Sequence, residues 1–505
     1  MEIELKLLLP AADNDKLRNH PLLAAHAQAE PQRAKLLARY FDTPDLHLFH
    51  HGAGLRVRKM DGAWVQTMKA GGSVQAGLHS RNEWEGEVAR AWPHLGKLRK
   101  LMNGDADGSW HDLLAAPGLA QRLQPLFAVR VERTTWHLHV GEAEIEMVLD
   151  SGAVEHNTTH DAINEIELEL KSGQPQALFD FALQLQQDLP LRVHNVSKAE
   201  RGYALCSQSG TRVHKAKPVA LDDGDTVEQA LQAILGNCLR HIQDNEAGVV
   251  HSDDDESVHQ MRVGVRRLRS ALKLFEPCVA FPEPLMAEIE WLGAALGAAR
   301  DWDVLANGTL QRATPALIAG KRVMALQALT SEAVHHQRQQ AIAAITAPRY
   351  THLLLAFGAW LSDSAGRAGP AMEQPALKFA RAALRSRHHK LLKRGAKVGD
   401  GDARALHRTR IAGKQARYAL EFFQPLFRRR LVRPYLDALS AMQDELGRHN
   451  DLVVADRLLT QLEQDHPEHG ASVALVRGYL LAQQESDQRA IRKVWKAFAS
   501  LDMPK

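Results

Sequence analysis

Two short segments in which charged and apolar residues alternate constrain how the first two hundred residues can fold. Residues 2–6 read Glu-Ile-Glu-Leu-Lys, and residues 165–169 read Glu-Ile-Glu-Leu-Glu. Because the side chains of a β-strand point alternately to opposite faces, the charged residues of each segment share one face. Carboxylates stacked inside a sheet are costly unless cations neutralise them, which favours divalent metals held by oxygen ligands. The pattern predicts strands whose charged face serves metals and an anionic partner.

Basic residues on strand-like segments between and after these two supply the complementary charge. They are Arg56, Arg58, Lys69, Arg81, Arg133 and Lys198. Turn signals such as Gly71-Gly72 separate the alternating segments. A closed ring of such strands would enclose a charged tunnel rather than a packed core. The alternative is that these charges only form salt bridges across a polar barrel interior, but so many paired charges would mainly cost desolvation.

Length and composition predict a globular protein with more than one domain. The chain has 505 residues, which is too long for one hydrophobic core. Its apolar fraction of 45% is ordinary for a globular protein. Its three cysteines lack metal-like spacing, which favours a reducing compartment without disulfides. The charged start and the absence of a bilayer-length apolar run predict a cytoplasmic protein with no membrane partner.

Net charge divides the chain into two parts of opposite sign. Residues 1–200 contain 21 Lys and Arg against 27 Asp and Glu, a net charge of −6, whereas the remaining residues contain 42 against 33, a net charge of +9. A polar stretch with Gly and Pro separates the two parts. We expect domains at 1–205 and 218–505, joined by a linker over 206–217.

Beyond the linker, the apolar period changes from 2 to 3.6, which predicts helices, and one helical pattern occurs twice. The repeated positions are His259, Arg262, Arg266 and Arg269, then His407, Arg410, Lys414 and Arg417. At about 100° per residue, each set falls within an arc of about 80°. A basic helix face is usually only solvated, but its duplication with the same spacing favours a functional pair. We call these two sets the first and second basic stripes.

In their order along residues 1–205, the motifs of the first part resemble the CYTH domain of the triphosphate tunnel metalloenzymes. The motifs are Glu2-x-Glu4-x-Lys6, Tyr40-Phe41-Asp42-Thr43, Arg56-x-Arg58, Lys69, Arg133, the segment Val148 to Gly152, the segment Glu165 to Glu169, and the segment Ser197 to Arg201. The resemblance implies an antiparallel β-barrel tunnel that uses Mg²⁺ or Mn²⁺.

The same resemblance implies a role for each charged position. The implied metal ligands are Glu2, Glu4, Asp150, Glu165, Glu167 and Glu169. The implied catalytic residues are Lys6, Asp150, Glu165 and Glu167. The implied substrate-binding residues are Arg56, Arg58, Lys69, Arg81, Arg133 and Lys198. Which of the three glutamates at 165, 167 and 169 ligate metal stays open.

The basic stripes resemble the signature of the CHAD family, the conserved-histidine α-helical domains, over residues 218–505. This resemblance implies two four-helix bundles about a pseudo-twofold axis, with long-chain polyphosphate bound by the residues of both stripes. The expected fold is therefore α+β and multidomain, with a barrel followed by an all-α region. Neither stripe carries an aromatic side chain on which a base could stack, so no nucleic acid is expected as a partner.

The two resemblances together predict a metal-dependent inorganic triphosphatase that cleaves tripolyphosphate to pyrophosphate and phosphate. One alternative within the same fold is an adenylate cyclase of the tunnel type or a thiamine triphosphatase. Another is a non-catalytic protein that binds polyphosphate and associates with polyphosphate granules, an association also expected for the enzyme. The sequence leaves the substrate within the triphosphate class, the preferred metal and the oligomeric state open.

Overall fold

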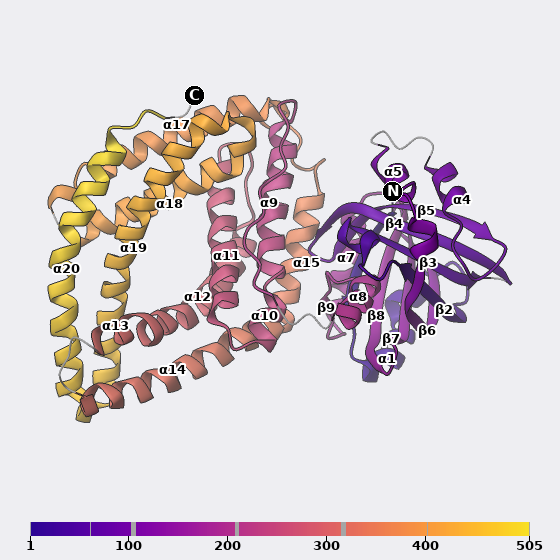
Figure 1. Cartoon of the computed structure of the whole chain (residues 1–505), viewed down its shortest axis with the longest axis horizontal. Coiled ribbons are helices and arrows are strands. Elements are labelled where there is room, and N and C mark those ends of the chain that lie inside the picture. The colour runs from indigo at the N-terminus through magenta and orange to yellow at the C-terminus, as the bar shows by residue number, and fades with distance from the viewer. Residues whose placement is uncertain are drawn as a thin grey trace. The chain divides into compact units, whose positions relative to one another are not determined.

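The computed structural model describes residues 2–60, 62–102, 108–207, 212–314, 320–400 and 402–503, so residues 208–211 of the predicted linker lie outside the described residues. Packing divides the chain into two units (Figure 1). The barrel unit comprises Met1–Gly210 and Pro348–Asp363. The helical unit comprises Thr211–Ala347 and Ser364–Lys505. Each unit is described separately below.

Eight antiparallel strands close into a barrel in the first unit. These strands are β1 (Glu2–Leu8), β2 (Gln32–Asp42), β3 (Ala53–Met60), β4 (Ala63–Gln75), β5 (Leu78–Val88), β6 (Gln124–Val140), β7 (Ala143–His156) and β8 (Thr159–Ser172). A two-residue ninth strand, β9 (Arg192–Val193), pairs with β1. The strand order is β5-β4-β3-β2-β6-β7-β8-β1-β9, and β1 also pairs with β5, which closes the ring. The predicted antiparallel barrel and the all-α second half are confirmed.

Charged and apolar side chains alternate along β1 and β8. Because the apolar side chains face outward and are covered there, the charged side chains face the barrel interior. Leu5 and Leu7 are fully buried, and so are Ile166 and Leu168 on β8. Helix α7 (Gln176–Gln186) packs on both strands. Burial of these leucines and isoleucine stabilises the barrel and fixes the register, since a shift by one residue would expose them.

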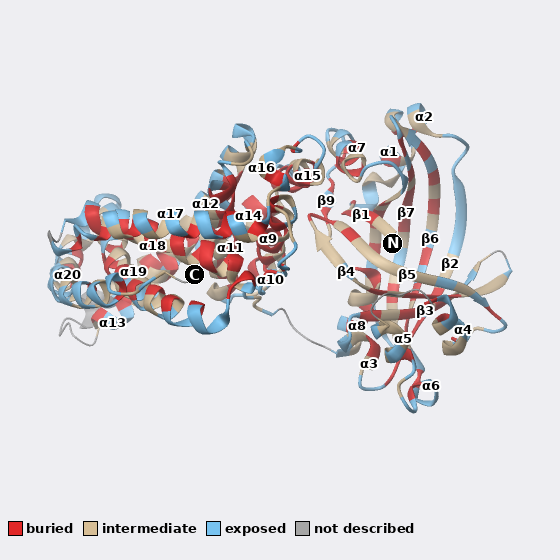
Figure 2. Ribbon diagram, turned by 90° about the horizontal axis from the view of Figure 1, so that it is seen from above, coloured by how far each residue is buried: buried red, intermediate tan, exposed pale blue. Residues whose placement is uncertain are grey.

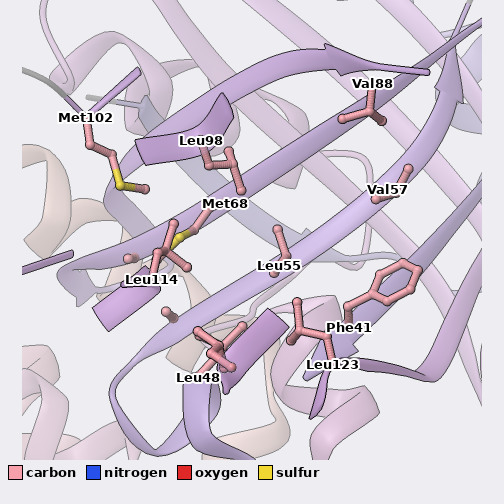
Figure 3. Packing of buried hydrophobic residues seen from close by; sticks show 13 residues of the cluster. Phe41, Leu48, Leu55, Val57, Met68, Val88, Leu98, Met102, Leu114 and Leu123 are labelled. Atoms are coloured by element: carbon pink, nitrogen blue, oxygen red, sulfur yellow. The ribbon is translucent and has the colours of Figure 1, made fainter. Parts of the chain in front are cut away.

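A second apolar layer covers the outside of β2 to β5 (Figure 3). Leu55 and Val57 of β3 are buried in it, so Arg56 and Arg58 between them face the barrel interior. The layer is completed by the short helices α3 (His47–His50), α4 (Leu95–Leu101), α5 (Ser109–Leu114) and α6 (Leu119–Arg122). The remaining helices of this region are η1 (Ala11–Asp13), α1 (Asn14–Arg18) and α2 (Pro21–His26).

Helix α8 (Lys198–Ser207) closes the interior at the apolar end of the strands. Along β6 the inward residues change from Arg133 to Val131, Val129 and Phe127, which are buried together with Tyr203 of α8. Gly202 of α8 lies so close to the Phe127 ring that a Cβ atom would come within 2.1 Å of it. The interior therefore has a charged part and an apolar part, and α8 packs on the apolar part.

Helix α15 (Pro348–Ser362) belongs to the barrel unit although it lies far along the sequence. It packs on α7 and on β9. Gly358 allows the close approach, because a Cβ atom at this position would lie 2.2 Å from the ring of Phe179. The predicted division at 205 and 218 had assigned this segment to the helical half.

The second unit consists of long helices joined by short turns (Figure 1). Its helices are α9 (Val227–Gln243), α10 (Glu246–His251), α11 (Asp255–Phe275), α12 (Glu283–Asp303), α13 (Gln311–Ala313), α14 (Gly320–Thr346), α16 (Pro370–Glu373), α17 (Ala376–Gly395), α18 (Ala403–Phe423), α19 (Arg429–Asp465) and α20 (Gly470–Ala499). A π-helical turn occupies Val304–Leu310, and 3₁₀ turns occupy Val398–Asp400, Gln424–Leu426 and Pro467–His469. The buried apolar faces of the helices form the core of this unit (Figure 2).

The two repeats of the helical unit begin in the same way. Asp254 caps α11 by accepting from the Glu256 amide at 2.9 Å, and Asp402 caps α18 by accepting from the Ala405 amide at 3.0 Å. A bridge between Thr226 and Pro375 joins the starts of α9 and α17. Equivalent caps start the helices that carry the two basic stripes at equivalent positions.

Candidate functional site

Lys6 links the acidic residues of the first and eighth strands inside the barrel. The register places Lys6 opposite Glu167, and Glu4 opposite Glu169. Lys6 is buried, its Nζ lies 2.9 Å from Glu4 Oε1, and it also contacts Glu167. Burial alone would raise the pKa of Glu4, but Lys6 outweighs it, with help from Lys69, and the pKa falls to about 2. Glu4 is therefore a carboxylate at any physiological pH.

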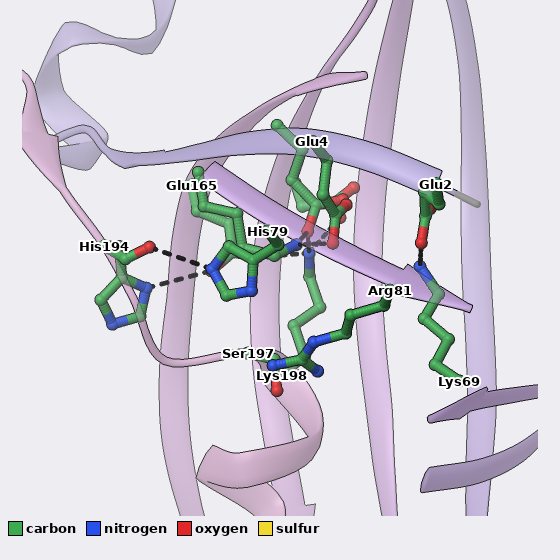
Figure 4. A network of polar contacts seen from close by, with 12 residues as sticks. Glu2, Glu4, Lys69, His79, Arg81, Glu165, His194, Ser197 and Lys198 are labelled. Carbon is green, nitrogen blue, oxygen red and sulfur yellow. Dashed lines mark hydrogen bonds and ion pairs between the residues drawn. The ribbon is translucent and has the colours of Figure 1, made fainter. Parts of the chain in front are cut away.

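Lys198 enters the same cluster from the first turn of α8 (Figure 4). Ser197 and Glu200 hold the start of this helix, since Glu200 Oε2 accepts from the Ser197 amide at 2.8 Å and from its hydroxyl at 2.6 Å. Lys198 Nζ then lies 2.8 Å from Asp150 and 2.9 Å from Glu167, and it also contacts Glu165. Burial lowers the pKa of Lys198, but these three carboxylates raise it well above its usual value.

Arg133 completes the cluster from β6. Its Nε and Nη2 donate to the two oxygens of Asp150 at 2.8 and 2.6 Å, and Nη2 lies 3.4 Å from Glu167. Asp150 is fully buried, and its two oxygens are bonded to Arg133 and Lys198. The structure thus brings together seven of the predicted residues: Glu4, Lys6, Arg133, Asp150, Glu165, Glu167 and Lys198.

The other predicted substrate-binding cations line the interior beside this cluster. Lys69 pairs with Glu2, as Figure 4 shows, and Arg58 lies 3.2 Å from Glu85. Arg56 lies 3.9 Å from Glu83, and Arg81 lies 3.4 Å from Glu200. Among the described residues, the buried Nε atoms of Arg56 and Arg58 have no hydrogen-bond partner. Both guanidinium groups face the barrel interior, where an anion could supply the missing partner.

The basic stripes of the helical unit face each other across α11 and α18. Helices α11 and α18 are in contact. Burial and the neighbouring cations Arg266 and Arg262 of α11 lower the pKa of Arg410 on α18, with Asp451 acting against them. Burial, followed by Arg266, Arg410 and Arg262, lowers the pKa of Lys414 to about 6. Cations from both repeats are thus close enough to repel one another.

Partners of the stripe residues are few. Arg262 lies 3.2 Å from Asp301, Arg269 lies 2.7 Å from Glu290, and Arg417 donates to Glu421 at 2.6 Å. His259 is half-buried, whereas His407 is exposed. Among the described residues, the buried Nε atoms of Arg266 and Arg410 have no hydrogen-bond partner. An excess of positive charge therefore remains between the stripes.

Comparison with known proteins assigns both units. The CYTH domain model matches residues 1–203, and the CHAD domain model matches residues 233–460. The solved structure of the CHAD domain from the plant Ricinus communis is 47% identical, with a TM-score of 0.54, and the match covers 59% of this chain and 99% of that one. The chain belongs to the CHAD family, and a CYTH domain precedes its CHAD domain.

A curated relative extends this assignment for the CYTH domain. It is the inorganic triphosphatase of Haemophilus influenzae, which is 34% identical over 208 residues. The match covers 41% of this chain and 55% of that protein, so the chain spans about half the length of this relative. Along the described ranges, no helix is both long and apolar enough to cross a membrane.

The acidic residues of the CYTH domain fit a divalent cation by their chemistry. Members of this family typically use divalent metals, and carboxylate oxygens are the ligands of hard cations. Burial raises the pKa of Glu169, Lys171 opposes this rise, and Glu2 and Glu146 add to it. Negative charge is therefore in excess around Glu169, beside Glu4. In the part of the chain that the structure describes, no three His, Cys, Asp or Glu side chains form a ready metal cluster. Lysines pair with two of the predicted ligands, Lys6 with Glu4 and Lys69 with Glu2.

Glu165 differs from its neighbours on β8. Its side chain is fully buried and lies within 4 Å of side-chain nitrogen atoms of Lys198, His194 and Arg201. Burial is the main cause that lowers the pKa of both His194 and His79 to about 3, so these two histidines of the CYTH domain are neutral. Figure 4 shows His79 beside the His194 backbone, whose carbonyl lies 3.4 Å from Nε2. The predicted roles of Glu165 and Asp150 as metal ligands stay predictions.

Sequence reasoning assigned no role to three residues that the structure places in or beside these sites. Glu83 pairs with Arg56 and lies 3.9 Å from Lys69. Asp42 of the Tyr-Phe-Asp-Thr motif is a buried structural residue, because it accepts hydrogen bonds from the Leu48 and Phe49 amides and from Tyr203. In the CHAD domain, Arg267 is buried against Phe422 and Asn237, so it joins the two repeats. Only Glu83 carried a usable signal, since it alternates with Arg81.

Proposed function

We propose that the CYTH domain is an inorganic triphosphatase that hydrolyses tripolyphosphate to pyrophosphate and phosphate with Mg²⁺ or Mn²⁺. The observation that carries the proposal is the ring of cations on the inner barrel face, each held by a carboxylate. Lys6, Arg133 and Lys198 share Glu167. Phosphoryl transfer requires charge neutralisation and positioning more than covalent help from the protein. Such a ring would supply both.

The chain's own residues divide into two roles. Arg56, Arg58 and Lys69, with Arg81, Arg133 and Lys198, would bind the phosphate oxygens, because each is an interior cation. Glu2, Glu4 and Glu169 would hold the metal, and Glu167 would position Lys6 for the phosphate oxygens. The metal, when bound, would neutralise phosphate charge and lower the pKa of a water molecule. Asp150 and Glu165 would hold Arg133 and Lys198 in position.

The same pairing explains how a charged interior can stay folded without substrate. Lys6 forms an ion pair with Glu4, and Lys69 forms one with Glu2. When a triphosphate binds, the lysines would transfer to its oxygens and leave the two glutamates to the metal. Each ion pair would be exchanged for another, so no buried charge would be left uncompensated.

Product analysis tests the substrate assignment. Purified full-length protein with Mg²⁺ or Mn²⁺ is given tripolyphosphate, ATP or thiamine triphosphate, and the products are separated. We expect phosphate and pyrophosphate from tripolyphosphate at the highest kcat/KM. Cyclic AMP from ATP would instead support a tunnel-type adenylate cyclase. Preferred cleavage of thiamine triphosphate would support a thiamine triphosphatase. No turnover of any of the three would support a non-catalytic polyphosphate-binding protein.

We propose that the CHAD domain binds long-chain polyphosphate between its basic stripes. The close cations Arg262, Arg266, Arg410 and Lys414 come from two facing helices and match a thin chain with a charge at every unit. Labelled polyphosphate in competition with RNA tests this on the full-length protein. Polyphosphate should bind more tightly, and Arg262→Glu with Arg410→Glu should weaken it strongly. Equal or tighter binding of RNA would contradict the proposal.

A further inference from the structure

Helix α17 carries more positive charge than any role in the stripes requires. Its twenty residues include seven Lys and Arg and no Asp or Glu. The helix at the same place in the first repeat, α9, has one Arg and one Glu. The two helices hold equivalent positions in the two repeats but differ in charge. The packing of the fold therefore does not account for the cations of α17.

Arg387 connects α17 to both stripe helices. Its Nη2 donates to the Lys273 carbonyl oxygen at 2.9 Å, and its Nη1 donates to Gln415 Oε1 at 3.2 Å. Lys273 follows Arg269 by four residues, which continues the spacing of the first stripe on α11. Gln415 is the neighbour of Lys414 in the second stripe. Arg387 thus lies where the first stripe ends on α11, and beside Lys414 of the second stripe on α18.

In the described ranges, cations outnumber carboxylates around Arg387. Burial lowers the pKa of Lys390, and the neighbouring charges of Arg394, Arg387 and Lys273 lower it further. Glu276 acts in the opposite direction on both Lys390 and Arg387. Among the described residues, Lys390, Lys393 and Arg394 lie in no ion pair within 4.0 Å. At about 100° per residue, these three residues and Arg387 fall within an arc of about 120° of α17.

We propose that Lys273, Arg387, Lys390, Lys393 and Arg394 form a second polyphosphate-binding segment that extends the paired stripes along α17. The proposal rests on the proposed function of the CHAD domain. His259 to Arg269 covers only about 15 Å of helix axis, so a long chain must extend beyond the stripes. The next unpaired cations that it meets are those around Arg387. We call these five residues the α17 segment.

A phosphate chain fits the α17 segment better than RNA does. Single-stranded nucleic acid is usually held by bases stacked on aromatic faces. Phe379 of α17 is buried against Phe275 and Phe423, and the imidazole of His388 packs against Tyr435 and Phe498. The exposed ring of His389 could stack on a single base at most, so the α17 segment offers mainly charge, and RNA binding becomes an outcome of the test.

The experiment compares polyphosphate of two lengths on the full-length protein. The triple variant Lys390→Gln, Lys393→Gln and Arg394→Gln removes three charges while keeping good helix formers. The control variant Arg428→Gln, Arg429→Gln and Arg430→Gln removes three exposed charges at the start of α19. The probes are long-chain polyphosphate and fractionated chains no longer than the first stripe. Affinity is measured at several salt concentrations, with labelled RNA as a third probe.

We expect the α17 variant to lose about tenfold in affinity for the long chain, with the salt slope smaller by about two. The affinity of the α17 variant for the short chain should change less than about twofold. The affinity of the control variant for either chain should also change less than about twofold. An unchanged long-chain affinity, or an equal loss in the control, would overturn the α17 segment while leaving the stripes intact. Loss of RNA binding with unchanged polyphosphate binding would also overturn it. If the unmodified protein bound neither length, the proposed function of the CHAD domain would fail as well.

Discussion

Arg133 holds Asp150 by two hydrogen bonds, from Nε at 2.8 Å and from Nη2 at 2.6 Å, and Asp150 is fully buried. Bidentate pairs of this kind fix orientation as well as charge. Because Lys198 takes the remaining contact, Asp150 orients two cations of the inner barrel face. Its mutation therefore tests whether it acts on the substrate-binding cations or on the metal.

Asp150→Asn should weaken substrate binding more than metal binding. The amide keeps the volume but cannot accept two charge-assisted bonds, so Arg133 and Lys198 lose their fixed positions. We expect KM for tripolyphosphate to rise about tenfold, which corresponds to roughly one strong hydrogen bond. The Mg²⁺ concentration for half-maximal rate should stay unchanged, and Glu4→Gln serves as the comparison. A shift of the metal requirement as large as that of Glu4→Gln would make Asp150 a ligand.

Removal of Lys198 should destabilise the barrel strands. Lys198→Met leaves Asp150, Glu165 and Glu167 without their shared cation, and breaking a buried pair costs about 3–5 kcal/mol. The control is Lys171→Met, because Lys171 pairs with Glu169 at 2.7 Å but is 41% exposed, where such pairs are worth about 0–1 kcal/mol. Hydrogen exchange of the β7 and β8 amides measures the loss of stability in both variants. Equal protection in the two variants would contradict the buried cluster.

Polyphosphate binding should strengthen as pH falls towards about 6 and level off below it, where Lys414 is charged in both the free and the bound protein. Burial and then Arg266, Arg410 and Arg262 lower the pKa of Lys414 to about 6, so the free amine is mostly neutral at pH 7.5. A bound anion raises that pKa, which means that binding takes up a proton and is favoured at lower pH. Affinity measured from pH 5.5 to 8.5 should show this slope. Lys414→Arg should flatten it, since arginine stays charged, and an unchanged slope in that variant would contradict the assignment.

Gly358→Leu should destabilise the barrel unit from a helix that lies far along the sequence. A Cβ atom at this position meets Phe179 at 2.2 Å, and overpacking of this kind costs about 1–3 kcal/mol. Gly478→Leu is the matched control, because a Cβ atom on this helical glycine has no neighbour within 4 Å. Hydrogen exchange of α7 reports the effect. Unchanged protection of α7 in Gly358→Leu would show that α15 does not stabilise this unit.

The sequence predicted the inner face of the barrel because strand alternation is a local property. Glu2, Glu4 and Lys6 share a face whatever they pair with, and the repeat spacing places Arg262 and Arg410 at equivalent positions on two helices. Partners across the barrel depend on register, which local patterns leave open. The contact of Lys6 with Glu167, rather than with Glu165 or Glu169, therefore required the structure.

Contacts between distant segments were also beyond sequence reasoning. Helix α15 has an ordinary apolar helical pattern, and nothing in it indicates that Gly358 packs on Phe179. Arg387 is one of many arginines on α17, and only its hydrogen bond to the Lys273 carbonyl shows that these cations continue the first stripe. Tertiary packing decides both cases.

The most direct test of the account is phosphate release from tripolyphosphate by the full-length protein, with and without EDTA, in three forms. The forms are the unmodified protein, Glu4→Gln, and the control Glu155→Gln, which changes a carboxylate paired with the half-exposed Arg130. We predict metal-dependent release in the unmodified protein and the control, and a loss of at least about a hundredfold in Glu4→Gln, equivalent to about 2.7 kcal/mol in the barrier. Full activity of Glu4→Gln, or release that persists in EDTA, would contradict a metal-dependent reaction on the inner face of the barrel.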